Sequence, residues 1–198
     1  MDLAMNDQLD RPSILIGLVG FRCCGKSTLR VLLGELGYPV FNTNSVTTGD
    51  PDANRISLDE VIERYGAAHS YLHYIAEAMR EFVAMQDSVV FVDSLKVGSD
   101  LDVLKELFPR TPVELWYVHA SFQTRKNRYL ERDIRPGLRD SSLEEHDAAL
   151  ERHGVLSLIK QATEVVNTEL DLQMVRMEVE GSVRRTLKRY GICGKNSQ

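Results

Sequence analysis

A chain of 198 residues is long enough for one well-buried α/β domain and too short for two ordinary ones. Its net charge of −5 argues against general affinity for nucleic acid, because proteins of that class usually carry a basic surface. No apolar run approaches the length of a membrane span, and residues 1–12 form a polar tail rather than a signal peptide. Three cysteines without a disulfide framework indicate a reducing, cytoplasmic compartment.

Apolar runs alternate with segments of helical periodicity, which predicts βαβ units and a parallel sheet. In the first half of the chain we expect a strand at 13–19, a helix at 26–36, a strand at 38–41, a loop at 42–54, helices at 57–65 and 67–85, and a strand at 88–93. In the second half we expect a helix at 100–108, a strand at 113–119, a helix at 122–132 and a loop at 133–140. One or two helices at 142–161, a strand at 164–167 and a helix from 169 complete the chain. We expect a single domain over 13–191, with a C-terminal tail at 192–198.

The turn between the first strand and the first helix fits the G-x-x-x-x-G-K-[ST] pattern of a phosphate-binding loop. In such a loop the backbone N–H groups and the helix N-terminus surround the nucleotide phosphates. Lys26 is expected to reach the β- and γ-phosphates, and the Ser27 hydroxyl to hold Mg²⁺. The residues expected to bind the phosphates are Gly20, Phe21, Arg22, Cys23, Cys24, Gly25, Lys26, Ser27 and Thr28.

Asp93 ends the apolar strand expected at 88–93. The carboxyl ends of parallel strands meet at the edge of the sheet where ligands bind, so Asp93 is expected to face the phosphate loop. There it would hold a Mg²⁺-bound water or accept a proton from an attacking hydroxyl. The alternative is a residue that caps a turn or helix, which the neighbouring Ser94 and Gly98 also favour.

Five arginines follow the fourth strand. Three of them are spaced i, i+3, i+7 on one helical face, and two lie in a Pro-Gly loop; they are Arg125, Arg128, Arg132, Arg135 and Arg139. In phosphoryl transfer such guanidinium groups stabilise the transferring oxygens when a lid closes, so we expect a lid at 125–141. The alternative is a solvated helix face paired with Glu131, Asp133 and Asp140.

The order of these segments resembles the nucleotide-kinase branch of the P-loop proteins. It is most similar to dephospho-coenzyme A kinase and its archaeal relatives, and more distantly to adenylate kinase. The phosphate loop carries the likeness together with Arg64-Tyr65-Gly66, the strand end Asp93-Ser-Leu-Lys96, the lid helix and the closing strand 162–167.

The resemblance implies a three-layer fold with a five-stranded parallel sheet, a helical acceptor-binding insertion at 43–86 and an arginine-rich lid. It also implies that Asn167 lies beside the nucleotide base, and that Arg64 binds the acceptor. Arg55 is a further basic candidate within the insertion. Three places depart from the family pattern. No acid follows Phe41 before Asp50, Arg22-Cys23-Cys24 replaces the Gly-rich centre of the loop, and Ser94 stands where the relatives have glycine.

The sequence therefore predicts an ATP- and Mg²⁺-dependent enzyme that transfers a phosphoryl group to a nucleotide or nucleoside-like small molecule. Lys26, Asp93, Arg128, Arg132 and Arg135 would carry the reaction, with Ser27 and Asp93 at the metal. A second hypothesis is a nucleotide-binding switch or regulatory subunit, which the missing acid favours and the arginine-rich lid disfavours. A third is a kinase acting on a nucleotide within a nucleic acid, which the acidic balance disfavours.

Overall fold

One five-stranded sheet forms the centre of the computed structural model, which describes residues 13–43, 71–86, 89–131 and 142–192. All strand pairs are parallel, and the strand order is β2-β3-β1-β4-β5. The strands are β1 (Ile14–Val19), β2 (Val40–Asn42), β3 (Val89–Leu95), β4 (Val113–His119) and β5 (Glu164–Asn167). The α/β class with a five-stranded parallel sheet is therefore confirmed.

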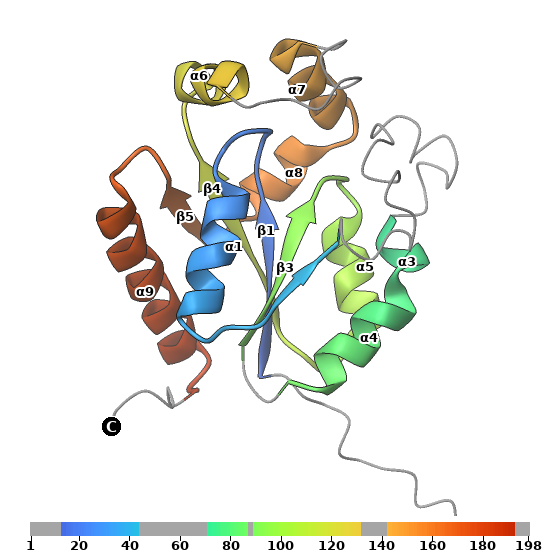
Figure 1. The fold of residues 1–198 in the computed structure, drawn as a ribbon. Coiled ribbons are helices and arrows are strands. Elements are labelled where there is room, and N and C mark those ends of the chain that lie inside the picture. The colour runs from blue at the N-terminus through green and yellow to red at the C-terminus, as the bar shows by residue number, and fades with distance from the viewer. Residues whose placement is uncertain (1–12, 44–70, 87–88, 132–141, 193–198) are drawn as a thin grey trace, which may run out of the picture.

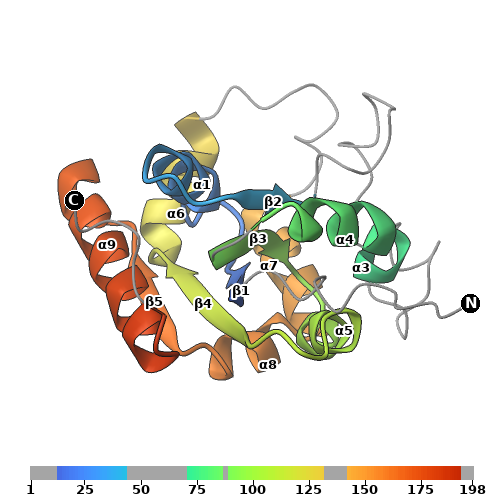
Figure 2. The same ribbon diagram turned by 90° about the horizontal axis from the view of Figure 1, so that it is seen from below.

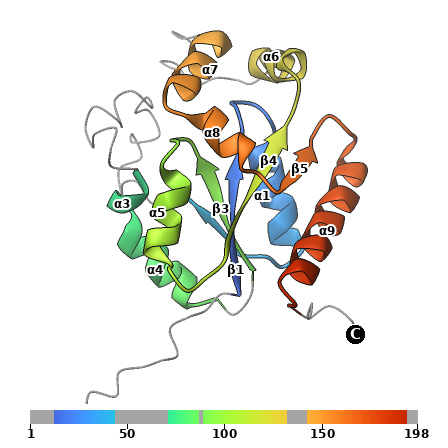
Figure 3. The same cartoon turned by 180° about the vertical axis from the view of Figure 1, so that it is seen from behind.

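Helices cover both faces of this sheet (Figure 1). The described helices are α1 (Lys26–Glu35), α3 (Tyr71–Tyr74), α4 (Ala76–Ala84), α5 (Asp100–Leu107), α6 (Phe122–Glu131), α7 (Leu143–Arg152), α8 (Val155–Lys160) and α9 (Leu172–Arg189). Figure 2 shows α1 and α9 on one side of the sheet and α5 and α8 on the other. Figure 3 shows α6 and α7 beyond the carboxyl ends of the strands, at the end of the sheet where β1 meets α1.

The alternation of side chains along each strand explains why two separate cores form. Ile14, Ile16 and Leu18 of β1 pack with α1 and α9, whereas Leu15 and Val19 pack with α4, α5 and α8. Every residue of β1 is buried, as expected for a strand covered by helices on both faces. The central strand is thus fixed from both sides, and the turn that follows it starts from a rigid point.

Some boundaries differ from the prediction. The helix predicted over 67–85 is divided, in its described part, into α3 and α4 at Ile75. β3 continues two residues beyond Asp93, so the prediction that this strand ends there was wrong. α9 begins at Leu172 because Asp171 caps it, accepting a hydrogen bond of 3.0 Å from Met174 N–H. The helix predicted at 57–65 lies outside the described residues.

None of the helices that the structure describes is both long enough and apolar enough to cross a membrane.

A network of charges joins α9 to the amino-terminal half of the sheet. Glu114 of β4 and Glu164 of β5 are both buried. Arg189 binds both carboxylates, and Arg185 lies 2.6 Å from Glu164. Thr163 also donates a hydrogen bond of 2.9 Å to Glu114. Each buried carboxylate is therefore compensated by a partner on the last helix.

We expect Arg189→Met to destabilise the protein by about 2 kcal/mol, because it leaves the buried Glu114 carboxylate without its guanidinium. The full cost for a buried pair is reduced here, since the Arg189 side chain is 43% exposed. The measurement is the free energy of unfolding in urea. Arg184→Met is the matched control, because Arg184 donates to the Glu180 carbonyl of its own helix. An equal loss in both variants would contradict the role of the network.

Candidate active site

The loop between β1 and α1 requires glycine at two positions, Gly20 and Gly25. Gly25 caps α1 with φ 99°, a left-handed conformation that favours glycine. A Cβ on Gly25 would lie 2.9 Å from Thr168 Oγ1, and a Cβ on Gly20 would lie 2.5 Å from the Val118 carbonyl oxygen. Cys23, at φ 61°, adopts a left-handed conformation without being glycine. The glycines of the sequence pattern are thus required by the conformation and by the close approach of β4 and β5.

Lys26 folds back onto this loop. Its Nζ donates hydrogen bonds of 2.6 Å to the Gly20 carbonyl and 2.9 Å to the Phe21 carbonyl. The Lys26 ammonium is therefore held at the loop itself, where it is available to an anion bound by the loop. Ser27 and Thr28 are exposed in the first turn of α1. Thr28 also lines the cavity beside the loop.

Asp93 lies near the carboxyl end of β3, beside β1, and is buried. Its carboxylate pairs with Arg30 of α1 at 3.5 Å and accepts a hydrogen bond of 3.1 Å from the Ser94 hydroxyl. The sequence reasoning missed Arg30, because nothing in its spacing indicates a partner on β3. Ser94 has φ 73°, which gives a physical reason for the glycine found at this position in the resembled family.

Arg125 of α6 has a structural role that the sequence did not indicate. It is buried, and its guanidinium forms two bonds to Asp147 of α7, at 2.8 and 2.7 Å. It also donates to the Arg22 carbonyl at 3.3 Å and stacks over the Phe21 ring at 4.9 Å. The alternative of a solvated residue was therefore wrong for Arg125, and the pair with Asp147 gives this arginine a structural role. The long-range partner Asp147 could not be identified from spacing.

Arg128 lies one helical turn further along α6 and reaches the phosphate loop. Its guanidinium donates to the Thr168 carbonyl at 2.5 Å, to Thr168 Oγ1 at 3.1 Å and to the Cys23 carbonyl at 3.4 Å. Thr168 Oγ1 in turn donates to the Cys24 carbonyl at 2.6 Å. These contacts tie α6, the phosphate loop and the segment after β5 together at one point.

Arg22, at a variable position of the loop pattern, binds α7. Its Nη1 donates to His146 Nε2 at 2.8 Å, and its guanidinium lies 5.7 Å from the centre of the Tyr129 ring. Burial lowers the pKa of His146, and the neighbouring Arg22 charge lowers it further. The imidazole is therefore kept neutral and able to accept this bond. Helices α6 and α7 together fix the outer part of the loop.

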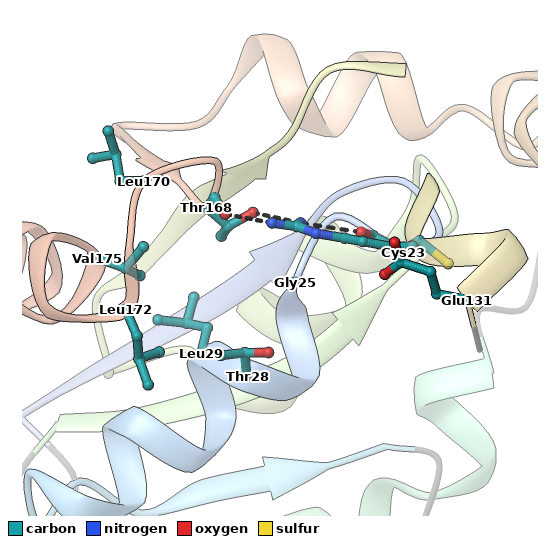
Figure 4. A pocket seen from close by; sticks show the side chains of 10 residues that line it. Cys23, Gly25, Thr28, Leu29, Glu131, Thr168, Leu170, Leu172 and Val175 are labelled. Atoms are coloured by element: carbon teal, nitrogen blue, oxygen red, sulfur yellow. Dashed lines mark hydrogen bonds between the residues drawn. The ribbon is translucent and has the colours of Figure 1, made fainter. Parts of the chain in front are cut away.

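A cavity of about 390 Å³ opens beside the loop. Figure 4 shows Cys23 and Glu131 at one end of it and Leu29, Leu170, Leu172 and Val175 at the other, with Gly25 and Thr28 between them. Arg128 and Thr168 complete the lining. A cavity of this kind, polar at the loop and apolar at its far end, suits a ligand that carries phosphate groups on a flat apolar body.

The structure brings together only some of the predicted site residues. Cys23, Gly25, Thr28 and Arg128 line the cavity, and Lys26 lies in the same loop. Asn167 is absent from the residues lining this cavity, and its side chain accepts a hydrogen bond of 3.0 Å from Glu169 N–H. Four of the predicted arginines lie outside the described residues: Arg55, Arg64, Arg132 and Arg135. Arg139 and the loop around it lie there too.

The sequence reasoning missed Thr168, although its position after a predicted strand could have indicated a role in the site. It directly follows β5, at the edge of the sheet where ligands of parallel α/β folds bind. The apolar end of the cavity was not readable, because Leu29 and Val175 meet there only when α1 and α9 pack on the same face of the sheet.

Solved structures with the same arrangement are P-loop kinases. Shikimate kinase from Aquifex aeolicus superposes with a TM-score of 0.53 at 20% identity, covering 87% of this chain and 98% of that one. A gluconokinase from Sinorhizobium meliloti gives 0.55 at 17% identity, covering 90% and 96%. Deoxyadenosine kinase from M. mycoides with bound dATP gives 0.58 at 16% identity, covering 86% and 100%.

The chain has the fold of the P-loop kinases. No protein-family model matches it, and no curated protein does. At these identities the likeness establishes the fold alone.

We expect Ser94→Gly to be more stable than Ser94→Ala by about 1 kcal/mol, because only glycine adopts φ 73° without strain. Both variants lose the bond from the Ser94 hydroxyl to Asp93, so their difference isolates the backbone. Thermal and urea unfolding measure it. If the two variants were equally stable, the strain at this position would be refuted.

Glu169 provides a pH-dependent tie between the segment after β5 and the start of α6. Its carboxylate accepts bonds from the Ser121 hydroxyl at 2.6 Å, from Ser121 N–H at 3.1 Å and from the Thr124 hydroxyl. These bonds lower the pKa of Glu169 to about 2, from an ordinary value of 4.5. The stabilisation of the folded state by the Glu169 carboxylate is therefore fully present above about pH 4.5, and it is lost as the pH falls toward 2.

At pH 7 we expect Glu169→Gln to have a lower free energy of unfolding than the unmodified protein. The difference between the two free energies should become smaller as the pH falls. Urea unfolding at pH 7, 4.5 and 3 measures this gap. Glu151→Gln on α7 is the exposed control. A difference in free energy of unfolding that stays constant from pH 7 to pH 3 would show that the charged Glu169 carboxylate does not stabilise the fold through these hydrogen bonds.

Proposed function

We propose that this chain is an ATP- and Mg²⁺-dependent kinase that phosphorylates a nucleotide or nucleoside-like small molecule. The observation that carries the proposal is the continuity of the phosphate loop with a cavity whose far end is apolar. Lys26 and the loop amides would hold the donor phosphates. The base would lie against Leu29, Leu172 and Val175. The cavity volume of about 390 Å³ is within the range of small-molecule sites.

Residues suited to Mg²⁺ are present, although the donor set is small. Among the described residues, no three His, Cys, Asp or Glu side chains come together as a metal cage. Mg²⁺ usually needs none, because it keeps several waters and binds through substrate phosphates and one or two protein oxygens. The exposed Ser27 hydroxyl would be a direct ligand. Asp93, which is paired with Arg30, would act at the metal through water.

The transferring phosphate would be covered from the side of α6. Arg128 contacts the Cys23 carbonyl of the loop, which supports a position of its guanidinium at the edge of the proposed phosphate site. We propose that Arg132 and Arg135, further along the same segment, act with it at the transferring oxygens. Arg64 and Arg55 would bind the acceptor.

The class of acceptor is inferred from the similar kinases and from the sequence likeness. The three similar kinases are named for shikimate, gluconate and deoxyadenosine, so one fold serves acceptors of different chemistry. The likeness to dephospho-coenzyme A kinase adds a fourth candidate. A nucleoside or nucleotide is favoured here because the sequence likeness is to nucleotide kinases.

The test is release of ADP from Mg²⁺-ATP by the purified full chain in the presence of single acceptors. The panel contains nucleosides, nucleoside monophosphates, dephospho-coenzyme A, shikimate and gluconate. We expect acceptor-dependent turnover with a nucleoside or nucleotide. Lys26→Ala should lower kcat/KM by about 10²-fold or more, because it removes a charge aimed at the transferring group.

Lys105→Ala, at an exposed position of α5, is the matched control and should retain full activity. Turnover that survives in Lys26→Ala would contradict the proposed site. Nucleotide binding without turnover on any acceptor would instead favour the nucleotide-binding switch.

A further inference from the structure

Thr168 directly follows β5 and lies between the phosphate loop and the end of β4. It is 6% exposed and lines the cavity beside the loop. Its N–H donates a hydrogen bond of 2.9 Å to the His119 carbonyl, at the end of β4. On the loop side, a Cβ on Gly25 would lie 2.9 Å from Thr168 Oγ1. The Thr168 side chain is therefore held in one place, in contact with the loop.

The Thr168 hydroxyl links the loop to Arg128 of α6. A hydroxyl has one proton to donate and two lone pairs that accept. Thr168 Oγ1 lies 2.6 Å from the Cys24 carbonyl and 3.1 Å from the His119 carbonyl, so the proton is placed on the shorter bond to Cys24. The lone pairs accept the bond of 3.1 Å from Arg128 Nη1. A chain of hydrogen bonds thus runs from Arg128 through Thr168 to the loop backbone.

The Arg128 guanidinium is held by Thr168 at both of its terminal nitrogens. Nη1 donates to the Thr168 hydroxyl, and Nη2 donates to the Thr168 carbonyl at 2.5 Å; these are the dashed lines that meet Thr168 in Figure 4. A third bond, of 3.4 Å, goes to the Cys23 carbonyl. All three acceptors are uncharged, so these bonds fix the direction of the guanidinium without neutralising its charge. The oriented cation lines the cavity.

The segment after β5 also fixes the helix that carries Arg128. Glu169 accepts hydrogen bonds from Ser121 N–H at 3.1 Å and from the hydroxyls of Ser121 and Thr124. Ser121, Thr124 and Arg128 are spaced by three and four residues, so they lie along one side of α6. Glu169 binds the first two of them, and Thr168 binds the one that also contacts the loop.

We propose that Thr168 is a positioning residue, which holds the Arg128 guanidinium toward the phosphates of a nucleotide bound in the cavity. This inference rests on the proposed function, because it takes the cavity as the donor site. Valine in place of Thr168 would keep the shape of the side chain, but it would neither donate to the Cys24 carbonyl nor accept from Arg128. The nucleotide itself would then have to order the guanidinium, and that ordering weakens binding.

The test is the binding of Mg²⁺-ATP to the full chain, measured by titration calorimetry. Thr168→Val removes the hydroxyl, and Thr168→Ser keeps it. Thr163→Val is the matched control, because Thr163 directly precedes β5 and its hydroxyl donates a bond of 2.9 Å to Glu114, at the opposite end of the strand. Thermal unfolding of each variant establishes that it is folded before binding is measured.

Arg128→Met, alone and combined with Thr168→Val, separates this role from a general loosening of the loop. If Thr168 acts through Arg128, the combined variant should bind ATP as strongly as Arg128→Met alone, because a guanidinium that is absent cannot be misplaced. If Thr168 acted only by supporting the loop, the losses from the two substitutions would add.

We expect Thr168→Val to raise the Kd for ATP by about tenfold, the effect of one lost charged hydrogen bond, and Thr168→Ser to stay within about threefold of the unmodified chain. Thr163→Val should change this Kd by less than about twofold, even where it lowers the unfolding temperature. An unchanged Kd in Thr168→Val, an equal loss in Thr163→Val, or additive losses in the combined variant would overturn the inference while leaving the proposed kinase intact. Failure of the unmodified chain to bind ATP would overturn the proposed function, and the inference with it.

Discussion

The left-handed turn at Cys23 and Gly25 is the constraint on which the rest of this structure depends. It allows β1 to reverse into α1 over six residues and brings the backbone within reach of Thr168. A bulkier residue at Gly25 would collide with Thr168, which follows β5. The tight turn therefore determines how closely the loop approaches this segment.

Three separate segments hold this turn in shape. Arg125 and Arg128 of α6 bind loop carbonyls, His146 of α7 binds Arg22, and the Thr168 hydroxyl binds the Cys24 carbonyl. These contacts are hydrogen bonds to loop carbonyls or to the Arg22 side chain. Because hydrogen bonds are directional, each of them orients the group that it binds. The loop is thus organised before any ligand enters, which lowers the ordering cost of binding.

Charge is distributed unevenly in this acidic chain. The end of the sheet beside the loop carries Arg22, Lys26 and Arg30, of which Arg30 is paired with the buried Asp93. The opposite half of β4 and β5 instead buries Glu114 and Glu164, which are compensated by two arginines of α9.

The sequence alone determined the order of the described strands and the phosphate loop. Its apolar runs predict β4 and β5 to the residue, and the glycine spacing predicts the turn, because both depend on local backbone geometry. Only the tertiary structure decided which charged side chains meet. Arg125 pairs with Asp147, and Arg30 pairs with Asp93, because strands and helices distant in sequence become neighbours. Such contacts follow from strand order and helix packing, and spacing along the chain carries no record of either.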